Sequence, residues 1–207
     1  MANWKETLLN PIFKGNPITV LVLGICSSLA VTVELKGALV MALSVTIVTG
    51  LSSLVCSLLR NTIPNRVRII VQLVVVALMV ILVDQFLKAF EATYPIDKSL
   101  SVYIGLIITN CIVMGRIEAF ALGNKPMPSL IDGLANGLGY GMILIIVAFV
   151  RELLGSGTLF GLQIVPQCLY NAGYVNNGLV ILPPFALILL GCIIWIHRSI
   201  DKDLQEK

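Results

Sequence analysis

Five cysteines are the residues of this sequence most able to do chemistry, and two of them have similar surroundings. Cys26 lies in the run Leu23-Gly24-Ile25-Cys26-Ser27-Ser28, and Cys111 lies in the run Ile107-Ile108-Thr109-Asn110-Cys111-Ile112. Each cysteine is therefore part of an apolar segment and stands beside small or polar residues. Two thiolates can hold one edge of a metal centre, whereas an iron–sulfur cluster usually takes four. A second chain would have to supply the other two, and zinc, which also accepts four thiolates, is the competing metal.

Nothing beside the other three cysteines, Cys56, Cys168 and Cys192, points to such a role. We expect them to be small apolar fillers, as most cysteines in apolar segments are. The chain contains no CxxC pair, and the widely varied spacing of its cysteines does not indicate the disulfide framework of a secreted domain.

Two acids at the ends of apolar runs are candidates for an ion pathway. Asp84 closes one run and Asp132 opens another. One interpretation is that both carboxylates are interfacial and solvated, because an acid within a membrane span costs free energy. The other is that they belong to a sodium route, since carboxylates raise the local concentration of a cation. In that case sodium would enter at Asp132 and leave at Asp84.

No complete catalytic site can be assembled from this chain. It has a single histidine, His197, and no GxGxxG motif that follows a strand, so it has no dinucleotide fingerprint. The run Gly137-Leu138-Gly139 is more typical of close packing between helices. No motif in the chain binds NADH or quinone.

The composition requires a polytopic membrane protein. The 207 residues are 57% hydrophobic, with a mean hydropathy of +0.97. Charged residues make up 12%, against about 25% in ordinary soluble domains. The net charge of +3 has no basic stripe behind it, so nucleic acid is excluded as a partner.

Cutting the chain at its charges gives six spans, because a bilayer core needs about 20 apolar helical residues. We interpret 153–177, with its glycines and Pro166, as a loop that partly re-enters the membrane or packs on protein. Dropping the short third run would leave five spans. The predicted spans are Gly15–Val33, Gly37–Leu59, Ile69–Val83 (extendable to Leu87), Ser99–Gly115, Gly133–Val150 and Gly178–Ile196.

The distribution of basic residues predicts that both termini are cytoplasmic. With that orientation, ten lysines and arginines lie in inside segments and four, namely Lys36, Lys88, Lys98 and Arg151, in outside segments. Basic residues in short loops favour the cytoplasmic side.

Six spans suggest a 3+3 inverted repeat within one integral membrane domain, with halves at about 1–98 and 99–207. Each half would open with a span that carries one cysteine near the middle of the membrane. Three spans per half make the halves run in opposite directions, so Cys26 and Cys111 would approach the midplane from opposite sides. The sequence therefore predicts an all-α fold with broken helices that carry the cysteines. A two-cysteine site there, with no polar access route, suits electron transfer better than structural zinc.

Several runs together resemble the D-type subunit of the bacterial sodium-translocating NADH:quinone reductases over essentially the whole chain. The run from Thr109 to Arg116, Thr-Asn-Cys-Ile-Val-Met-Gly-Arg, is the most specific. The others include Leu23-Gly24-Ile25-Cys26, Ser57-Leu58-Leu59-Arg60-Asn61, Val83-Asp84-Gln85, Asn136-Gly137-Leu138-Gly139-Tyr140-Gly141 and Arg151-Glu152-Leu153-Leu154-Gly155-Ser156-Gly157.

The resemblance implies a multi-pass component of a six-subunit translocase in the bacterial inner membrane. The D-type subunit and its E-type homologue, which has the opposite topology, would share a [2Fe-2S] cluster. Cys26 and Cys111 match the ligand positions of the D-type chain. FAD, FMN and riboflavin would be bound by the other four components, designated A, B, C and F. Electrons would pass from NADH to ubiquinone while sodium is exported.

Other functions remain open on the sequence. The E-type subunit of the Rnf-type ferredoxin:NAD reductases is homologous and is the close rival. A non-redox secondary transporter would share the inverted repeat and the broken spans. It would hold no metal, and serine could replace its cysteines. A purely structural membrane scaffold is a third possibility.

Overall fold

The computed structural model describes residues 15–64, 66–91, 105–159, 162–163 and 178–200. Within them the protein is almost entirely helical, and four helices are long and apolar enough to cross a membrane. These are α3 (Leu35–Leu59), α4 (Arg68–Glu91), α7 (Pro126–Gly155) and α9 (Pro183–Ile200). They correspond to the second, third, fifth and sixth predicted spans. The short third run, which the five-span alternative dropped, is thus one of the four candidate spans.

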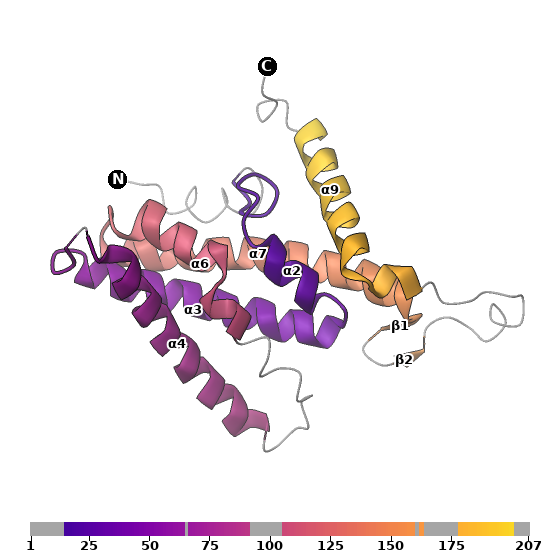
Figure 1. Cartoon of the computed structure of the whole chain (residues 1–207), viewed down its shortest axis with the longest axis horizontal. Coiled ribbons are helices and arrows are strands. Elements are labelled where there is room, and N and C mark those ends of the chain that lie inside the picture. The colour runs from indigo at the N-terminus through magenta and orange to yellow at the C-terminus, as the bar shows by residue number, and fades with distance from the viewer. Residues whose placement is uncertain (1–14, 65, 92–104, 160–161, 164–177, 201–207) are drawn as a thin grey trace, which may run out of the picture.

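Helices α3 and α7 lie side by side and form the centre of the molecule (Figure 1). Their contact depends on glycines spaced four residues apart on α7. A Cβ atom added at Gly133 would lie 2.8 Å from the Thr49 backbone oxygen, and one at Gly137 would lie 2.6 Å from Thr46 Cα. At Gly141 it would lie 3.0 Å from Ala42 Cβ. Close approach of backbones through small residues is the usual basis of helix packing in membranes, as the Gly137-Leu138-Gly139 run indicated.

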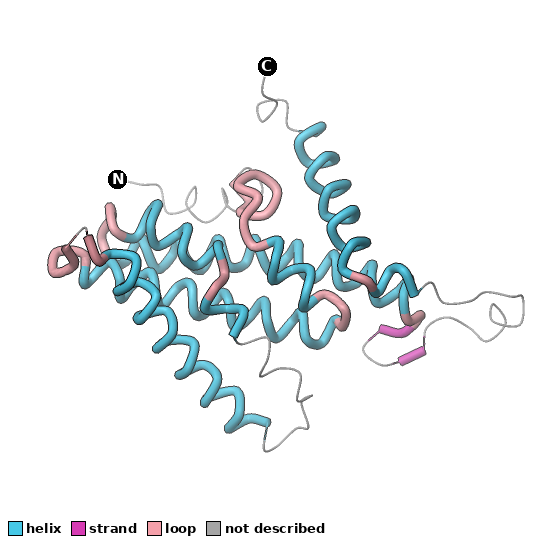
Figure 2. The backbone as a smooth tube through the Cα atoms, in the orientation of Figure 1, coloured by secondary structure: helices cyan, strands magenta, loops and turns pink. Residues whose placement is uncertain are grey.

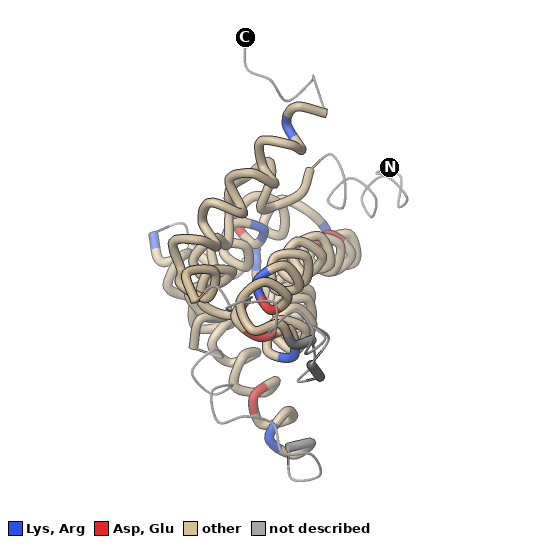
Figure 3. Tube along the Cα trace, turned by 90° about the vertical axis from the view of Figure 1, so that its right-hand side faces the viewer, with Lys and Arg blue, Asp and Glu red and all other residues tan. Residues whose placement is uncertain are grey.

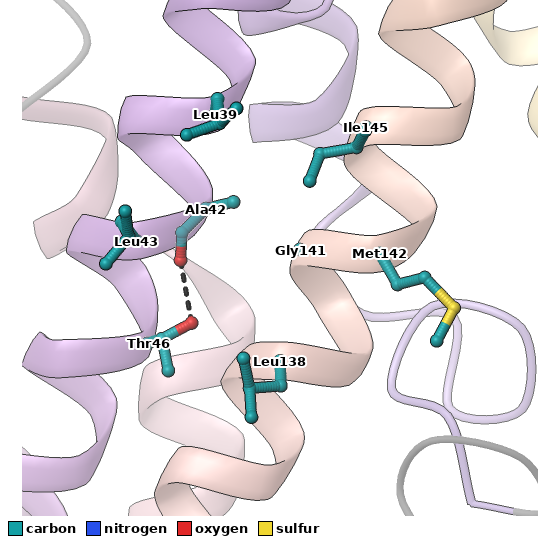
Figure 4. Close-up of a pocket in the computed structure, with 8 residues that line it drawn as sticks. All are labelled: Leu39, Ala42, Leu43, Thr46, Leu138, Gly141, Met142 and Ile145. Carbon is teal, nitrogen blue, oxygen red and sulfur yellow. Dashed lines mark hydrogen bonds between the residues drawn. The ribbon is translucent and has the colours of Figure 1, made fainter.

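An apolar groove of about 490 Å³ runs beside this glycine seam (Figure 4). Leu39 and Leu43 of α3 line one side, and Leu138, Met142 and Ile145 of α7 line the other. Thr46 satisfies its hydroxyl within its own helix by donating to the Ala42 carbonyl over 2.7 Å. A hydroxyl that bonds four residues back leaves the helix surface apolar, as a lipid-embedded segment requires.

Helix α7 is longer than the predicted fifth span and runs through the charged residues that set the prediction's limits. It begins with Pro126 in the first turn, where the missing N–H costs nothing, and ends at Gly155. Asp132 and Arg151 are buried within it and bonded by other protein groups. A charged residue ends a membrane helix only when its side chain must reach water. Because these two residues have protein partners instead, cutting the chain at its charges made the predicted fifth span too short.

The first and fourth predicted spans are not continuous helices. Residues 15–24 form turns and irregular backbone before α2 (Ile25–Val31), which is only seven residues long. Residues 105–108 are helical, the helix breaks at 109–110, and α6 (Cys111–Arg116) leads into the π-helix η1 (Ile117–Ala121). Figure 2 shows the loop before α2 and the break before α6 in pink. Residues 99–104 of the fourth span lie outside the described part.

The remaining elements surround this centre. Helices α4 and α9 leave the α3–α7 pair at an angle and expose most of their apolar side chains (Figure 1). The short 3₁₀ helix η2 (Gly178–Ile181) precedes α9. In the segment predicted as a re-entrant loop, α7 extends to Gly155 and a two-stranded hairpin follows, β1 (Thr158–Leu159) with β2 (Leu162–Gln163). Residues 164–177 lie outside the described part.

Candidate functional site

Both candidate cysteines stand at the start of a short helix that follows a non-helical segment, here called a break. Cys26 is the second residue of α2, and Cys111 is the first residue of α6. Both side chains are exposed, although the residues around them are largely buried. The two thiols are therefore available to a group or a chain that lies against this surface.

The two breaks have different local causes. Gly24 has φ +79° and ψ 17°, a left-handed conformation that glycine adopts without strain, and α2 begins immediately after it. Asn110 is extended, and its side-chain oxygen accepts the Ile112 N–H over 3.2 Å. This is the capping bond that favours asparagine before the first turn of a helix.

The two breaks are in direct contact. Asn110 Nδ2 donates to Ser27 Oγ over 3.2 Å, so the residue that precedes Cys111 is bonded to the residue that follows Cys26. A Cβ atom at Gly24 would lie 2.5 Å from Ile112 Cδ1. Residues next to the two cysteines thus pack together although Ser27 and Asn110 are 83 positions apart in the sequence.

The other cysteines differ in position. Cys56 is buried in α3, Cys192 is exposed on α9, and Cys168 lies outside the described residues. Among the residues that the structure describes, no three of His, Cys, Asp and Glu come close enough together to hold a metal ion. Within that part of the chain, Cys26 and Cys111 therefore have no third ligand beside them.

The two acids proposed for an ion route each have a basic partner. Asp132 is 4% exposed and accepts from Arg116 Nε over 3.0 Å, while Arg116 Nη2 bonds its other oxygen. Asn136 Nδ2 also donates to Asp132, over 3.1 Å. Asp84 accepts from Lys88 Nζ over 2.8 Å, one helical turn away. Figure 3 shows how sparse such charged positions are along the helices.

A third ion pair joins α4 to the π-helix and was not foreseen from the sequence. Arg68 pairs with Glu118, and Gln72 Nε2 donates to the other oxygen of Glu118 over 2.8 Å. Gln72 is 1% exposed. The sequence shows only a charged residue and an amide residue, one helical turn apart, at the start of an apolar run. The same pattern is typical of a helix end that faces solvent, so it did not indicate the ion pair.

Arg151 has a structural role that the sequence did not reveal. Its side chain is buried, and it donates to the Thr32 hydroxyl over 2.6 Å and to the Leu29 carbonyl over 3.2 Å, at the end of α2. It also donates to the Val180 and Ile181 carbonyls of η2. The distribution of charges placed Arg151 in an outside segment. It instead ties the helix that carries Cys26 to η2.

Comparison with known proteins identifies a family of membrane proteins, in agreement with the long apolar helices. Residues 4–194 match a family model described as "Rnf-Nqr subunit, membrane protein". The chain therefore belongs to the Rnf-Nqr family of membrane proteins.

Its curated relatives are more specific. A protein of Haemophilus influenzae, named as the D-type subunit of the Na(+)-translocating NADH-quinone reductase, is 56% identical over 206 residues. That match covers 100% of this chain and 98% of the relative. Proteins of the same name from Aeromonas hydrophila and Pseudomonas aeruginosa are 56% and 52% identical. The Pseudomonas match covers 98% of this chain and 89% of the relative.

Proposed function

We propose that this chain is an integral membrane subunit of a sodium-translocating NADH:quinone reductase, a translocase of the bacterial inner membrane. The observation that carries the proposal is 56% identity over the full length of relatives named as the D-type component of that enzyme. The names of these relatives favour the sodium pump over an Rnf-type ferredoxin:NAD reductase, although the family includes both.

Within that enzyme, we propose that Cys26 and Cys111 hold one side of a [2Fe-2S] cluster. Both thiols are exposed, and the residues beside them are hydrogen-bonded to each other. Such a cluster takes four cysteine ligands, and the described residues offer no further ligand nearby. The homologous E-type chain would supply the other two. The cluster, when bound, provides a one-electron carrier within the membrane, and this chain's residues place its thiolates and exclude water.

The larger assembly follows from the same proposal. FAD, FMN and riboflavin would be bound by the other subunits, because this chain has no dinucleotide motif. The breaks before Cys26 and Cys111 support a 3+3 inverted repeat, with α2 and α6 as the resumed halves of two broken spans. Six spans in one domain, with halves at 1–98 and 99–207, thus remain the proposed topology.

Iron analysis of the purified complex tests the redox proposal against its rivals. We expect the complex to contain iron and, when reduced, to give a rhombic electron paramagnetic resonance signal from a [2Fe-2S] cluster. That signal must be distinct from the signal of any iron–sulfur cluster on another subunit. Zinc would give bound metal without a signal. A secondary transporter or a scaffold would give no metal at this site. A complex without cluster iron between this chain and its E-type homologue would overturn the proposal.

Cytoplasmic termini are proposed from the bias of basic residues. Removing the buried Arg151 from the outside set strengthens the bias, because three basic residues then remain there against ten inside. An alkaline phosphatase reporter, which needs the periplasm, should be inactive when fused after Lys207. A green fluorescent protein at the same position should be fluorescent. The reverse pattern would contradict the six-span topology.

The sodium role of Asp84 and Asp132 remains a prediction. Each carboxylate is engaged by a cationic side chain, and a sodium ion would have to compete with that partner. We expect Asp132→Ala to raise the sodium concentration needed for half-maximal quinone reduction while leaving the cluster signal intact. If neither Asp132→Ala nor Asp84→Ala changes the sodium dependence, both acids are structural and the route lies elsewhere.

A further inference from the structure

We propose that Ser27, Asn110 and Tyr140 form a positioning network that fixes Cys26 and Cys111 relative to each other. The proposal rests on the proposed function, because it concerns the same two thiols. The network joins α2, the break before α6 and the long helix α7. Its three side chains are 3%, 3% and 0% exposed, so each lost bond would leave a polar group without water to replace the partner.

The directions of the hydrogen bonds follow from the chemistry of the groups. Ser27 Oγ lies 3.0 Å from the Gly24 carbonyl, 3.2 Å from Asn110 Nδ2 and 2.8 Å from the Tyr140 hydroxyl. A serine hydroxyl has one hydrogen and two lone pairs. The carbonyl can only accept and the amide nitrogen can only donate, so the serine hydrogen goes to Gly24. The Tyr140 hydroxyl must then donate to Ser27.

Two hydrogen bonds each enclose the short backbone segment that contains one of the thiols. The bond from Ser27 to Gly24 closes the turn of backbone that contains Cys26. On the other side, Asn110 caps the Ile112 N–H across Cys111. The Asn110–Ser27 bond joins these two backbone segments. The backbones at both thiols are therefore held through a single oxygen atom, Ser27 Oγ.

Tyr140 connects this point to the most closely packed part of the molecule. It lies between Gly139 and Gly141 on α7, and Gly141 is in the seam with α3. The ring also packs against Gly24, where an added Cβ would lie 3.2 Å from Tyr140 Cε2. The Gly139 carbonyl accepts from Asn16 Nδ2 over 3.1 Å and anchors the chain ahead of α2. The network therefore relates both thiols to α7.

The network makes an asymmetric prediction. Ser27→Ala removes the acceptor that two buried donors share, whereas Tyr140→Phe removes one donor and leaves Ser27 with an unused lone pair. A buried donor that has lost its acceptor costs its full desolvation free energy, whereas in Tyr140→Phe the Ser27 hydroxyl keeps its bonds to Gly24 and Asn110. Groups that orient metal ligands contribute about 10- to 100-fold to metal affinity. We therefore expect Ser27→Ala to speed cluster loss to an iron chelator at least about tenfold, and Tyr140→Phe less.

The first measurement uses the assembled complex with its cluster. The midpoint potential and the paramagnetic resonance signal should shift in Ser27→Ala and in Tyr140→Phe, and Ser27→Thr, which keeps a hydroxyl, should restore the wild-type values. The matched control is Thr49→Val. Thr49 is equally buried, and its hydroxyl bonds only the Val45 carbonyl of its own helix, over 2.6 Å. Shifts as large in the control as in the network variants would overturn the proposal.

The second measurement needs no cluster and separates this proposal from the proposed function. In complexes whose Cys56, Cys168 and Cys192 are replaced by alanine and whose metal has been removed, bis-maleimides of graded length bridge Cys26 and Cys111, and mass spectrometry measures the yield. We expect one preferred length in the wild-type network and a broader range in Ser27→Ala. An unchanged length profile overturns the positioning network. If the length profile depends on Ser27 but the complex never contained iron, the positioning network is supported and the cluster proposal is overturned.

Discussion

Cys26→Ser and Cys111→Ser should each abolish the [2Fe-2S] signal of the purified complex and stop electron flow from NADH to quinone. A thiolate is stable within a membrane only while a metal compensates its charge. A serine hydroxyl is a far weaker ligand for iron, and half of the cluster's protein ligands would come from this chain. The measurement is the spin concentration of the cluster and the rate of quinone reduction in the same preparation.

Two other cysteines of the same chain serve as matched controls. Cys56→Ala and Cys192→Ala should leave the signal and the rate within about twofold of wild type, because neither residue stands at a break and a small apolar replacement preserves packing. A cluster that survives in Cys26→Ser or in Cys111→Ser would exclude that residue as a ligand. Equal losses in all four variants would point to a general failure of assembly.

Arg116→Met should destabilise the protein more than any substitution on its outer surface. It would leave the Asp132 carboxylate, which is 4% exposed, without its bidentate cationic partner. Breaking a buried pair by removing one member costs about 3–5 kcal/mol, because the remaining charge has lost its compensation. We expect a corresponding fall in the thermal midpoint of the complex in detergent.

A double variant and an exposed pair provide the controls for that experiment. Arg116→Met combined with Asp132→Leu should recover most of the stability, since replacing both charges by apolar groups is often neutral. Lys88→Met breaks the pair with Asp84, in which the lysine side chain is 49% exposed. Exposed pairs contribute about 0–1 kcal/mol, so this variant should stay close to wild type. A drop as large for Lys88→Met as for Arg116→Met would refute the distinction.

Sequence patterns predicted the helix limits well where the charged residues lie near the helix ends. The runs assigned to 37–59 and 69–87 correspond closely to α3 and α4. The prediction was wrong at α7, because hydropathy treats Asp132 and Arg151 as exposed whereas both have protein partners. Broken helices at the two cysteines were predicted, but the position of the break before Cys26 was not, because a mean hydropathy is insensitive to the left-handed backbone at Gly24.

The candidate site could be predicted only in part for a related reason. Cys26 and Cys111 stood out because they occupy matching places in the two halves of the chain, and the bond between Ser27 and Asn110 brings their neighbours together. Tyr140 is 113 positions from Ser27 and lies among glycines. Its role depends on the way α7 packs, and no local spacing encodes that contact.

The glycine seam between α3 and α7 limits how this sequence can change during evolution. Any side chain larger than hydrogen at Gly133 or Gly137 would meet the backbone of α3 rather than a movable side-chain end. The opposite helix can offer little in exchange, because Gly50 has no side chain and Ala42 has only a methyl group to lose. A larger residue on the α7 side of the seam therefore cannot be compensated by a smaller residue on α3. Descendants of this chain are expected to diversify on the outer faces of α4 and α9 instead.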